Sequence, residues 1–359
     1  MLGRLGGDEF AIILPGVDEV EAQRVACSLL EAIRETISIS VQGAARHTTA
    51  SIGIAPFTHV AELTEEDLLV EADIAMYDAK EAGRDRAIVY SSSGDGQPRM
   101  QARLTWADRI QLALQEERFV LYAQPILALN GDSVPRHELL LRMVGDDGEM
   151  VPPGAFLSVA ERMGLVAEID HWVLRQTIGV LADHQHAGHD VCLEVNLSAK
   201  SINESDFAAI IAQELQAAGA DGRGLCVEIT ETAAIVNVEH ARRFAAKLAK
   251  LGCEFALDDF GAGFASFYYL KHLVFEYVKI DGEFINAIAE SRTDQLVVRS
   301  LVQIACGLGK RTIAEFVGDH EALELLRHYG VDYAQGFYVA EPKPLADIDL
   351  AQPPQIPAH

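Results

Sequence analysis

Short apolar runs alternate with longer stretches of helical periodicity from about residue 119 to residue 337. This alternation is typical of repeated βα units around a mostly parallel sheet. The eight runs are Phe119–Gln124, Glu138–Met143, Val191–Asn196, Leu225–Ile229, Glu254–Asp259, Tyr277–Asp281, Arg311–Glu315 and Tyr333–Phe337. Eight units in roughly 240 residues have the usual size of a closed barrel, so the pattern predicts an α/β fold of the TIM-like (β/α)8 class.

Residues 1 to 90 show a shorter α/β pattern. The expected strands are Glu9–Leu14, Ala50–Phe57 and Ala87–Tyr90, and the expected helices are Val20–Ser38 and Thr64–Ala82. Because the first strand begins almost at Met1, we expect its usual sheet neighbour to be missing and this layer to be small and incomplete. The turn-rich segment Ser91–Pro98 predicts a linker. We therefore expect a front domain at residues 1–92, a linker at 93–103, a barrel domain at 104–350 and a disordered tail at 351–359.

The composition narrows the kinds of partner and compartment. A hydrophobic content of 49% is ordinary for a globular protein, whereas a formal net charge of −25 repels polyanions. We expect no DNA or anionic lipid as a partner, and an anionic substrate would need help from metal ions. No apolar stretch has the length of a membrane span. The five scattered cysteines indicate neither a disulfide framework nor a zinc knuckle, and they favour a reducing cytoplasm.

A polar residue lies on or next to every expected strand of the barrel. Because the carboxyl ends of barrel strands form the reactive face, we expect these side chains to converge. They are Gln124, Glu138, Asn196, Glu228, Asp258, Asp259, Lys279, Glu315 and Gln335. Carboxylate and amide oxygens suit Mg²⁺ or Mn²⁺, and adjacent aspartates can bridge two ions that bind both oxygens of a phosphoryl transfer. The set therefore predicts a metal-carboxylate site suited to phosphodiester hydrolysis.

The residues alone leave two alternatives open. Single members of the set have ordinary structural explanations: Asn196 can cap the next helix, and Asp259 can belong to a turn. The spacing also permits a different magnesium-dependent barrel enzyme, in which Lys279 is a base and the ion stabilises an enolate.

Several spaced motifs extend the argument from about Trp106 to Pro344. They are Glu138-Leu-Leu-Leu-Arg142, Asn196-Leu-Ser198, Glu228-Ile-Thr-Glu231, Asp258-Asp-Phe-Gly-Ala-Gly263, Val278-Lys-Ile-Asp281, Ala314-Glu315 and Gln335-Gly-Phe337. In this order they resemble the EAL family of cyclic di-GMP phosphodiesterases. The resemblance implies that two ions of Mg²⁺ or Mn²⁺ activate a water, which cuts cyclic di-GMP to linear pGpG, and that the protein is a homodimer formed through the barrel.

The resemblance also implies a role for each matching residue. The first ion would be held by Glu138, Asn196, Glu228 and Asp258, and the second by Asp258, Asp259 and Glu315. Lys279 would position the nucleophile, with Glu315 as the accompanying base. Arg142 and Gln124 would contact phosphate, and Gln335 would complete the inner site. Glu231 would anchor the loop Phe260–Ser266, which in the family couples the metal site to dimer contacts.

Two segments depart from the family pattern. The family's Ala-Glu-Gly-Val-Glu appears as Ala314-Glu-Phe-Val-Gly318, which alters the expected contacts to the substrate base. Alanines at positions 262 and 265 replace polar residues, which alters the expected coupling to the dimer.

The front residues resemble the back part of a GGDEF diguanylate cyclase domain. The matching motifs are Gly6-Gly-Asp-Glu-Phe10, Ser51-Ile-Gly-Ile-Ala55, Ala72–Tyr77 and Gly83-Arg-Asp-Arg86. The family's first strand, metal-binding aspartate and inhibitory Arg-x-x-Asp site would all precede Met1, so we expect no cyclase activity. A truncation, a misassigned start and a regulatory or dimer-forming remnant remain alternatives.

Two functions from different classes compete for the barrel. One is an active phosphodiesterase, and the other is a catalytically silent receptor that binds cyclic di-GMP and signals through a partner. A receptor could lose metal ligands without losing its function. Every expected ligand and the lysine are present here, which favours the enzyme.

Overall fold

The chain is described by a computed structural model over residues 2–6, 9–36, 38–41, 44–47, 49–57, 68–69, 71–72, 75–76, 79–80, 83–90, 97–131, 134–145, 148, 150–203, 207–261 and 273–354. It divides into two compact units, residues 1–111 with 154–163 and residues 112–153 with 164–359. Several features expected from the sequence lie outside the described residues. They are Asp8, most of the helix Thr64–Ala82, residues 93–96 of the linker, Ala262, Ala265 and the tail beyond residue 354. Residues 97–103, which were expected to belong to the linker, are helical.

The first unit contains more strands than the sequence pattern predicts. Strands β1 (Leu2–Gly6) and β2 (Glu9–Ile12) form an antiparallel hairpin, and β3 (Ser38–Val41) and β4 (Ala44–His47) form another. Strands β5 (Ser51–Ile54) and β6 (Arg86–Val89) are parallel and contact helix α1 (Glu19–Thr36). The prediction of no strand before Glu9 was wrong, because β1 pairs with β2. Helix α3 (Gln97–Gln115) follows.

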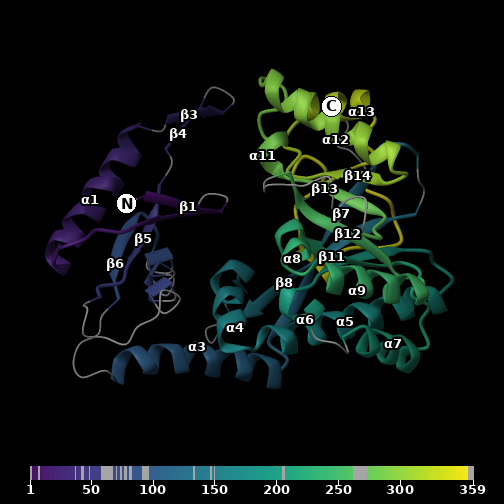
Figure 1. The fold of residues 1–359 in the computed structure, drawn as a ribbon, viewed down its shortest axis with the longest axis horizontal. Coiled ribbons are helices and arrows are strands. Elements are labelled where there is room, and N and C mark those ends of the chain that lie inside the picture. The colour runs from purple at the N-terminus through teal and green to yellow at the C-terminus, as the bar shows by residue number, and fades with distance from the viewer. Residues whose placement is uncertain are drawn as a thin grey trace. The chain divides into compact units, whose positions relative to one another are not determined.

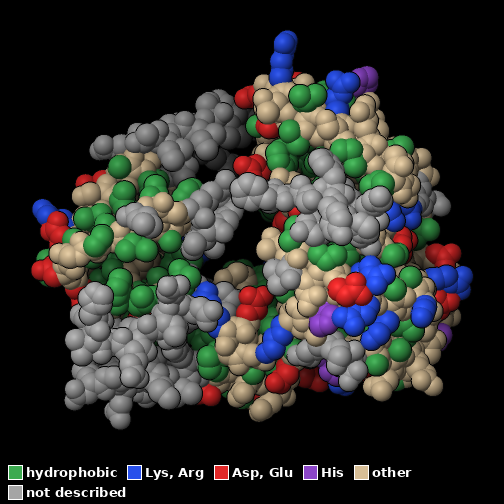
Figure 2. Space-filling model, viewed as in Figure 1, with side chains coloured by type: hydrophobic (Ala, Val, Ile, Leu, Met, Phe, Trp, Pro, Cys, Tyr) green, Lys and Arg blue, Asp and Glu red, His purple; other side chains and the backbone are tan. Residues whose placement is uncertain are grey.

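The first unit is an open layer. Among the described residues its strands form three separate two-stranded sheets. Many large hydrophobic side chains remain in contact with solvent, and they gather on the visible face of this unit in Figure 2; Val20 is 77% exposed and Leu2 is 69% exposed. Two-stranded sheets cannot bury much apolar surface.

The second unit is a closed barrel of eight strands surrounded by helices (Figure 1). The strands are β7 (Phe119–Ala128), β8 (Arg136–Val144), β10 (Cys192–Asn196), β11 (Leu225–Thr230), β12 (Glu254–Phe260), β13 (Tyr277–Ile280), β14 (Arg311–Ala314) and β15 (Tyr333–Ala334). Each expected run coincides with one of them. Strand β7 pairs with both β8 and β15, and these pairings close the barrel. The predicted (β/α)8 class is confirmed.

Strand β7 runs in the opposite direction to its neighbours. From β8 through β15 every pairing in the barrel wall is parallel, whereas β7 is antiparallel to β8 and to β15. Phe119 at the start of β7 lies opposite Met143, near the carboxyl end of β8. The chain therefore enters the barrel at the carboxyl ends of the parallel strands. Two short strands, β9 (Met150–Val151) and β16 (Lys343–Pro344), extend the sheet.

Helices connect the parallel strands. They are α5 (Val166–His186), α6 (Ala199–Asn203), α7 (Phe207–Ala218), α8 (Glu231–Val236), α9 (Val238–Lys250), α11 (Gly282–Ile285), α12 (Arg292–Gly307) and α13 (His320–Tyr329), with α4 (Leu157–Met163) assigned by its contacts to the first unit. Side chains of Asn237, Ser291 and Asp319 cap α9, α12 and α13, satisfying backbone N–H groups that a helix start leaves unpaired. In the described part of the chain, no helix combines the length and the apolar character that crossing a bilayer requires.

Candidate active site

Alternation along each strand places the polar residues inside the barrel. A layer of buried residues, including Cys226, Ala256, Tyr277, Ile313 and Tyr333, packs across the barrel interior. Side chains two positions apart on a strand point to the same face. Two positions after these residues the chain carries Glu228, Asp258, Lys279, Glu315 and Gln335. On β7, which runs the other way, Gln124 comes two positions before its core residue Ile126. The polar residues therefore form one layer, at the carboxyl ends of the parallel strands.

Lys279 is the centre of this layer and is completely buried. Its Nζ lies 2.8 Å from Glu228, 2.9 Å from Glu315 and 3.2 Å from Glu138. An oxygen of Asp258 lies 3.8 Å away. Burial alone would lower the pKa of Lys279, but the surrounding carboxylates outweigh it and hold the pKa well above its usual value. Lys279 is a permanent ammonium in the middle of the site.

The carboxyl groups carry more negative charge than one lysine can balance. Burial is the largest cause that raises the pKa of Glu315 to about 8, against the opposing charge of Lys279. Burial and the neighbouring Asp258 raise the pKa of Asp259 to about 6. Burial also raises the pKa of Glu228 well above its usual value. Desolvation disfavours the ionised form of an acid, and a nearby cation favours it. The layer is therefore chemically suited to take up further positive charge.

Three of these carboxylates are close enough to share one cation. Ligand oxygens of Asp258, Asp259 and Glu315 lie within 4.8 Å of one another, and no other trio of histidine, cysteine or acidic residues does so in the part of the chain that is described. Asp259 takes a left-handed backbone conformation with φ of 54°, next to the strand end. Oxygen ligands alone suit a hard divalent ion such as Mg²⁺ or Mn²⁺. The donor set fits the metal that the sequence predicts.

Side-chain amides complete the layer around Glu138. Asn196 donates to one oxygen of Glu138 at 2.6 Å, and Gln335 donates to the other at 2.6 Å. Gln335 also donates to Gln124 at 3.0 Å, and Gln124 donates to the backbone oxygen of Ala340 at 3.1 Å. The buried amide oxygen of Gln335 has no hydrogen-bond partner among the described residues. Buried polar atoms are normally paired, so this oxygen is available to a bound ligand.

The remaining predicted residues lie at the rim. Arg142 is half-buried, donates to the backbone oxygen of Leu141 at 2.7 Å, and lies over the ring of Tyr122. Glu231 accepts a hydrogen bond at 3.1 Å from the backbone N–H of Gly261, where the loop after β12 begins. Phe316, which departs from the family pattern, is 64% exposed and has a left-handed φ of 54°.

Two buried charged residues below the site are absent from the sequence prediction. Arg136 donates a hydrogen bond to Glu194, and both side chains are buried. Burial would raise the pKa of Glu194, but Arg136 holds it below its usual value. The available signal was the charge of Glu194 at an inward position between the apolar Leu193 and Val195.

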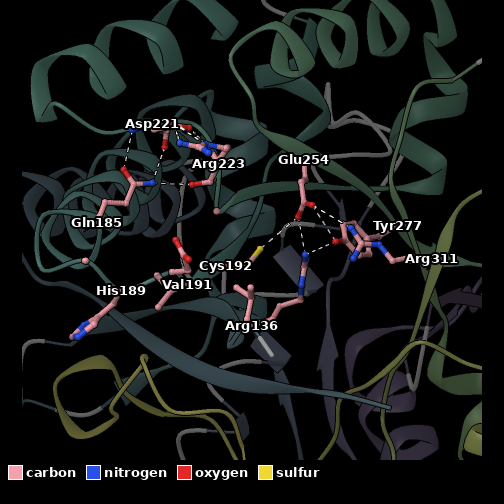
Figure 3. Close-up of a pocket in the computed structure, with 14 residues that line it drawn as sticks. Arg136, Gln185, His189, Val191, Cys192, Asp221, Arg223, Glu254, Tyr277 and Arg311 are labelled. Carbon is pink, nitrogen blue, oxygen red and sulfur yellow. Dashed lines mark hydrogen bonds and ion pairs between the residues drawn. The ribbon is translucent and has the colours of Figure 1, made fainter. Parts of the chain in front are cut away.

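A cavity of about 620 Å³ lies at the opposite, amino-terminal mouth of the barrel (Figure 3). Its charged side chains are paired with one another. Arg136 donates to Glu254 at 2.7 Å and to the hydroxyl of Tyr277 at 2.5 Å, and Arg223 donates to Asp221 at 2.8 Å. In barrels this end generally contributes stability and the other end chemistry. We therefore assign the site to the Lys279 layer and the paired charges to the base of the barrel.

Comparison with known proteins shows which family the chain resembles. Residues 107–342 match the model of the EAL domain, and residues 1–86 match the GGDEF domain of diguanylate cyclases. The cyclic di-GMP phosphodiesterase PdeB of Shewanella oneidensis is 35% identical over 96% of this chain and 40% of its own length. MucR of Pseudomonas aeruginosa, a bifunctional diguanylate cyclase/cyclic di-GMP phosphodiesterase, is 32% identical over 97% of this chain and 50% of its own length. The chain thus spans half or less of these relatives.

Solved structures show the same barrel. The EAL domain of FimX from Pseudomonas aeruginosa, bound to c-di-GMP, superposes with a TM-score of 0.64 at 32% identity, covering 68% of this chain and 99% of that one. The PaMucR phosphodiesterase in complex with c-di-GMP gives a TM-score of 0.64 at 30% identity and the same coverage of both chains. The chain belongs to the EAL-domain family, with a GGDEF-type segment ahead of the barrel.

Proposed function

We propose that this chain hydrolyses one phosphodiester bond of cyclic di-GMP to give linear pGpG, using Mg²⁺ or Mn²⁺ bound at the Lys279 layer. The observation that carries the proposal is the convergence of Glu138, Glu228, Asp258 and Glu315 on one buried ammonium. EAL-domain phosphodiesterases are metal-dependent in general, and the relatives PdeB and MucR are named as phosphodiesterases of cyclic di-GMP. The substrate, the ions and their number are parts of the proposal.

Each residue of the layer has a role in the proposed reaction. Glu138, Asn196, Glu228 and Asp258 would hold one ion, and Asp258, Asp259 and Glu315 a second. The ions supply an activated water and neutralise charge on the phosphate. Lys279 would orient the attacking oxygen, and Glu315 would be the accompanying base. Arg142, Gln124 and Gln335 bind the substrate, and Glu231 holds the start of the loop after β12.

The test is turnover of the purified chain with cyclic di-GMP, with and without added Mn²⁺ or Mg²⁺, followed by chromatography of the guanine nucleotides. We expect pGpG only when metal is present. Glu138→Ala and Asp258→Ala should each abolish turnover while the circular dichroism spectrum stays that of the wild type. The control Glu290→Ala changes an exposed carboxylate outside the layer and should leave turnover intact. If Asp258→Ala turned over cyclic di-GMP as fast as the wild type, the proposed metal site would be wrong.

A receptor of the same dinucleotide is the second candidate. Its support is the solved FimX domain with bound c-di-GMP, which shows that this type of barrel holds the ligand. Tight binding of cyclic di-GMP with no product at saturating metal would favour the receptor. Phe316 and Gly318, which replace the family residues beside Glu315, would then be the first positions to revert.

The wider setting is also proposed. We take the front segment at residues 1–92 to be inactive and the barrel at residues 104–350 to be the catalytic domain. We also propose that the protein works in the cytoplasm and forms a homodimer through the barrel. Sedimentation of the purified chain would measure the assembly, and a monomer at all concentrations would contradict the dimer. Incubation with GTP should give no cyclic di-GMP.

A further inference from the structure

A buried carboxylate on α5 is bonded to the turn that follows Asn196. Asp170 is 6% exposed. One of its oxygens, Oδ2, accepts three hydrogen bonds: from the Ser198 backbone N–H at 3.0 Å, the Ser198 hydroxyl at 2.6 Å and the Ser201 hydroxyl at 2.7 Å. Hydrogen bonds to an ionised acceptor are stronger than those between neutral groups. Asp170 therefore ties the turn firmly to helix α5.

The same turn is fixed on its other side by the barrel. The backbone N–H of Leu197 donates to the carbonyl of Glu228 at 2.9 Å, which extends the pairing of β10 with β11 past the end of the strand. Ser198 then turns the chain into α6, and its hydroxyl accepts from the backbone N–H of Ser201 at 3.3 Å. Asn196, the last residue of β10, is thus held between a barrel strand and a helix outside the barrel.

Fixing the backbone fixes the direction of the Asn196 side chain. Its amide nitrogen donates to Glu138 at 2.6 Å, which turns the amide oxygen away from Glu138. A metal ligand must be presented within a few tenths of an ångström, and the groups that orient it are worth about 10- to 100-fold in metal affinity. The three hydrogen bonds to Oδ2 of Asp170 all come from this turn, so through them Asp170 acts on the backbone next to Asn196.

We propose that Asp170 is a positioning residue of the site: by holding the turn at Ser198 it presents the amide oxygen of Asn196 to the first divalent ion. This inference rests on the proposed function, because it requires a metal at the Lys279 layer. A purely structural Asp170 would support α5 and α6 without any effect on metal affinity. A measurement of metal affinity therefore distinguishes the positioning role from the purely structural role.

The experiment measures Mn²⁺ binding to substrate-free protein by electron paramagnetic resonance of the free ion. We expect Asp170→Ala to weaken binding at least about tenfold, and Ser201→Ala, which removes one of the three donors, to weaken it by a smaller factor. The matched control is Thr177→Ala, because Thr177 is a fully buried residue of the same helix whose hydroxyl donates only to the backbone of Val173. It should bind Mn²⁺ as the wild type does.

The outcomes separate this inference from the function on which it rests. If the wild type binds Mn²⁺ and both Asp170→Ala and Ser201→Ala bind it equally well, the positioning role is overturned. If the wild type itself binds no Mn²⁺, the proposed metal site fails first. If Asp170→Ala does not fold, the Mn²⁺ affinity of Ser201→Ala tests the proposal instead, because this variant keeps the Asp170 carboxylate and helix α5. Recovery of wild-type kcat in Asp170→Ala at high Mn²⁺ would support a role in affinity alone.

Discussion

Glu315 and Asp259 keep their protons at pH values at which exposed carboxyl groups have lost them. Burial is the largest cause, and it raises the pKa of Glu315 to about 8 and that of Asp259 to about 6. In the unfolded chain both return to about 4. Between about 4 and 8 the folded protein therefore binds more protons than the unfolded chain. The free energy of unfolding must therefore fall as the pH rises through this window, because the two acids, once ionised, are buried away from water in the folded protein.

We expect the metal-free protein to lose stability between about pH 5 and about pH 8 relative to the variant Glu315→Gln, which cannot ionise there. The difference should be of the order of a few kcal/mol. Urea denaturation in the presence of a chelator at several pH values measures it. Added Mn²⁺ should raise the stability of the wild type most at high pH. Parallel pH profiles for the two proteins would contradict the raised pKa of Glu315.

Single residues differ in how far the sequence reveals them. Glu138, Asp258, Lys279 and Glu315 stand out because each is a charged residue within or at one end of an apolar run, and the structure brings all four together. Asp170 gives no such signal, since an acid in the middle of an amphipathic helix is normally solvent-exposed. Only the turn that it meets in space gives it a role. The role of such a residue depends on contacts with residues far away in the sequence, which the local sequence pattern does not reveal.

At the scale of elements, the loop after β14 and the start of α11 fit each other closely. Phe316 has a left-handed backbone, and its side chain lies against Gly282, the first residue of α11. A Cβ atom added at Gly282 would lie 2.4 Å from Cδ2 of the Phe316 ring. No real contact is that short, so the larger residue at 316 requires glycine at 282.

This fit predicts coupled effects of two substitutions. Gly282→Ala alone should destabilise the protein by about 1–3 kcal/mol, because the added methyl overpacks the contact. In a Phe316→Gly background the same change should cost much less, since the ring is gone. A double-mutant cycle in urea measures the coupling. Additive effects would mean that the ring moves aside freely and that the contact does not constrain position 282.

The existence of the barrel elements follows from the sequence, but their directions do not. All eight apolar runs are strands, because length and period suffice to indicate a strand. The reversed direction of β7 has no local signature, since a strand reads alike in both directions. The strand β1 and the hairpin of β3 and β4 were also missed, although Ser38–Val41 alternates between polar and apolar residues. The direction of β7 and the presence of β1, β3 and β4 depend on pairing with another strand, which becomes visible only in the folded structure.

At the scale of the whole molecule, net charge opposes the proposed substrate. The chain carries a formal charge of −25, and a cyclic dinucleotide carries two negative phosphates. Salt screens this repulsion over a Debye length of about 10 Å at 0.1 M. We expect kcat/KM to rise by about twofold or more as KCl increases from about 0.02 M to about 0.2 M at fixed Mn²⁺, with kcat unchanged. A fall in kcat/KM would show that a local positive field guides the substrate.

The reversed strand has a mechanical consequence. Since β7 starts beside the carboxyl end of β8, the polypeptide ahead of the barrel joins it at the reaction end, five positions before Gln124. A pull on that polypeptide would first load the hydrogen bond from the Val144 backbone N–H to the Arg118 carbonyl, 2.7 Å long, and then unzip β7 toward Gln124. The layer around Arg136, at the far end of the same strand pair, would be the last to open. Tension from upstream would therefore reach the substrate-binding groups before it reaches the base of the barrel.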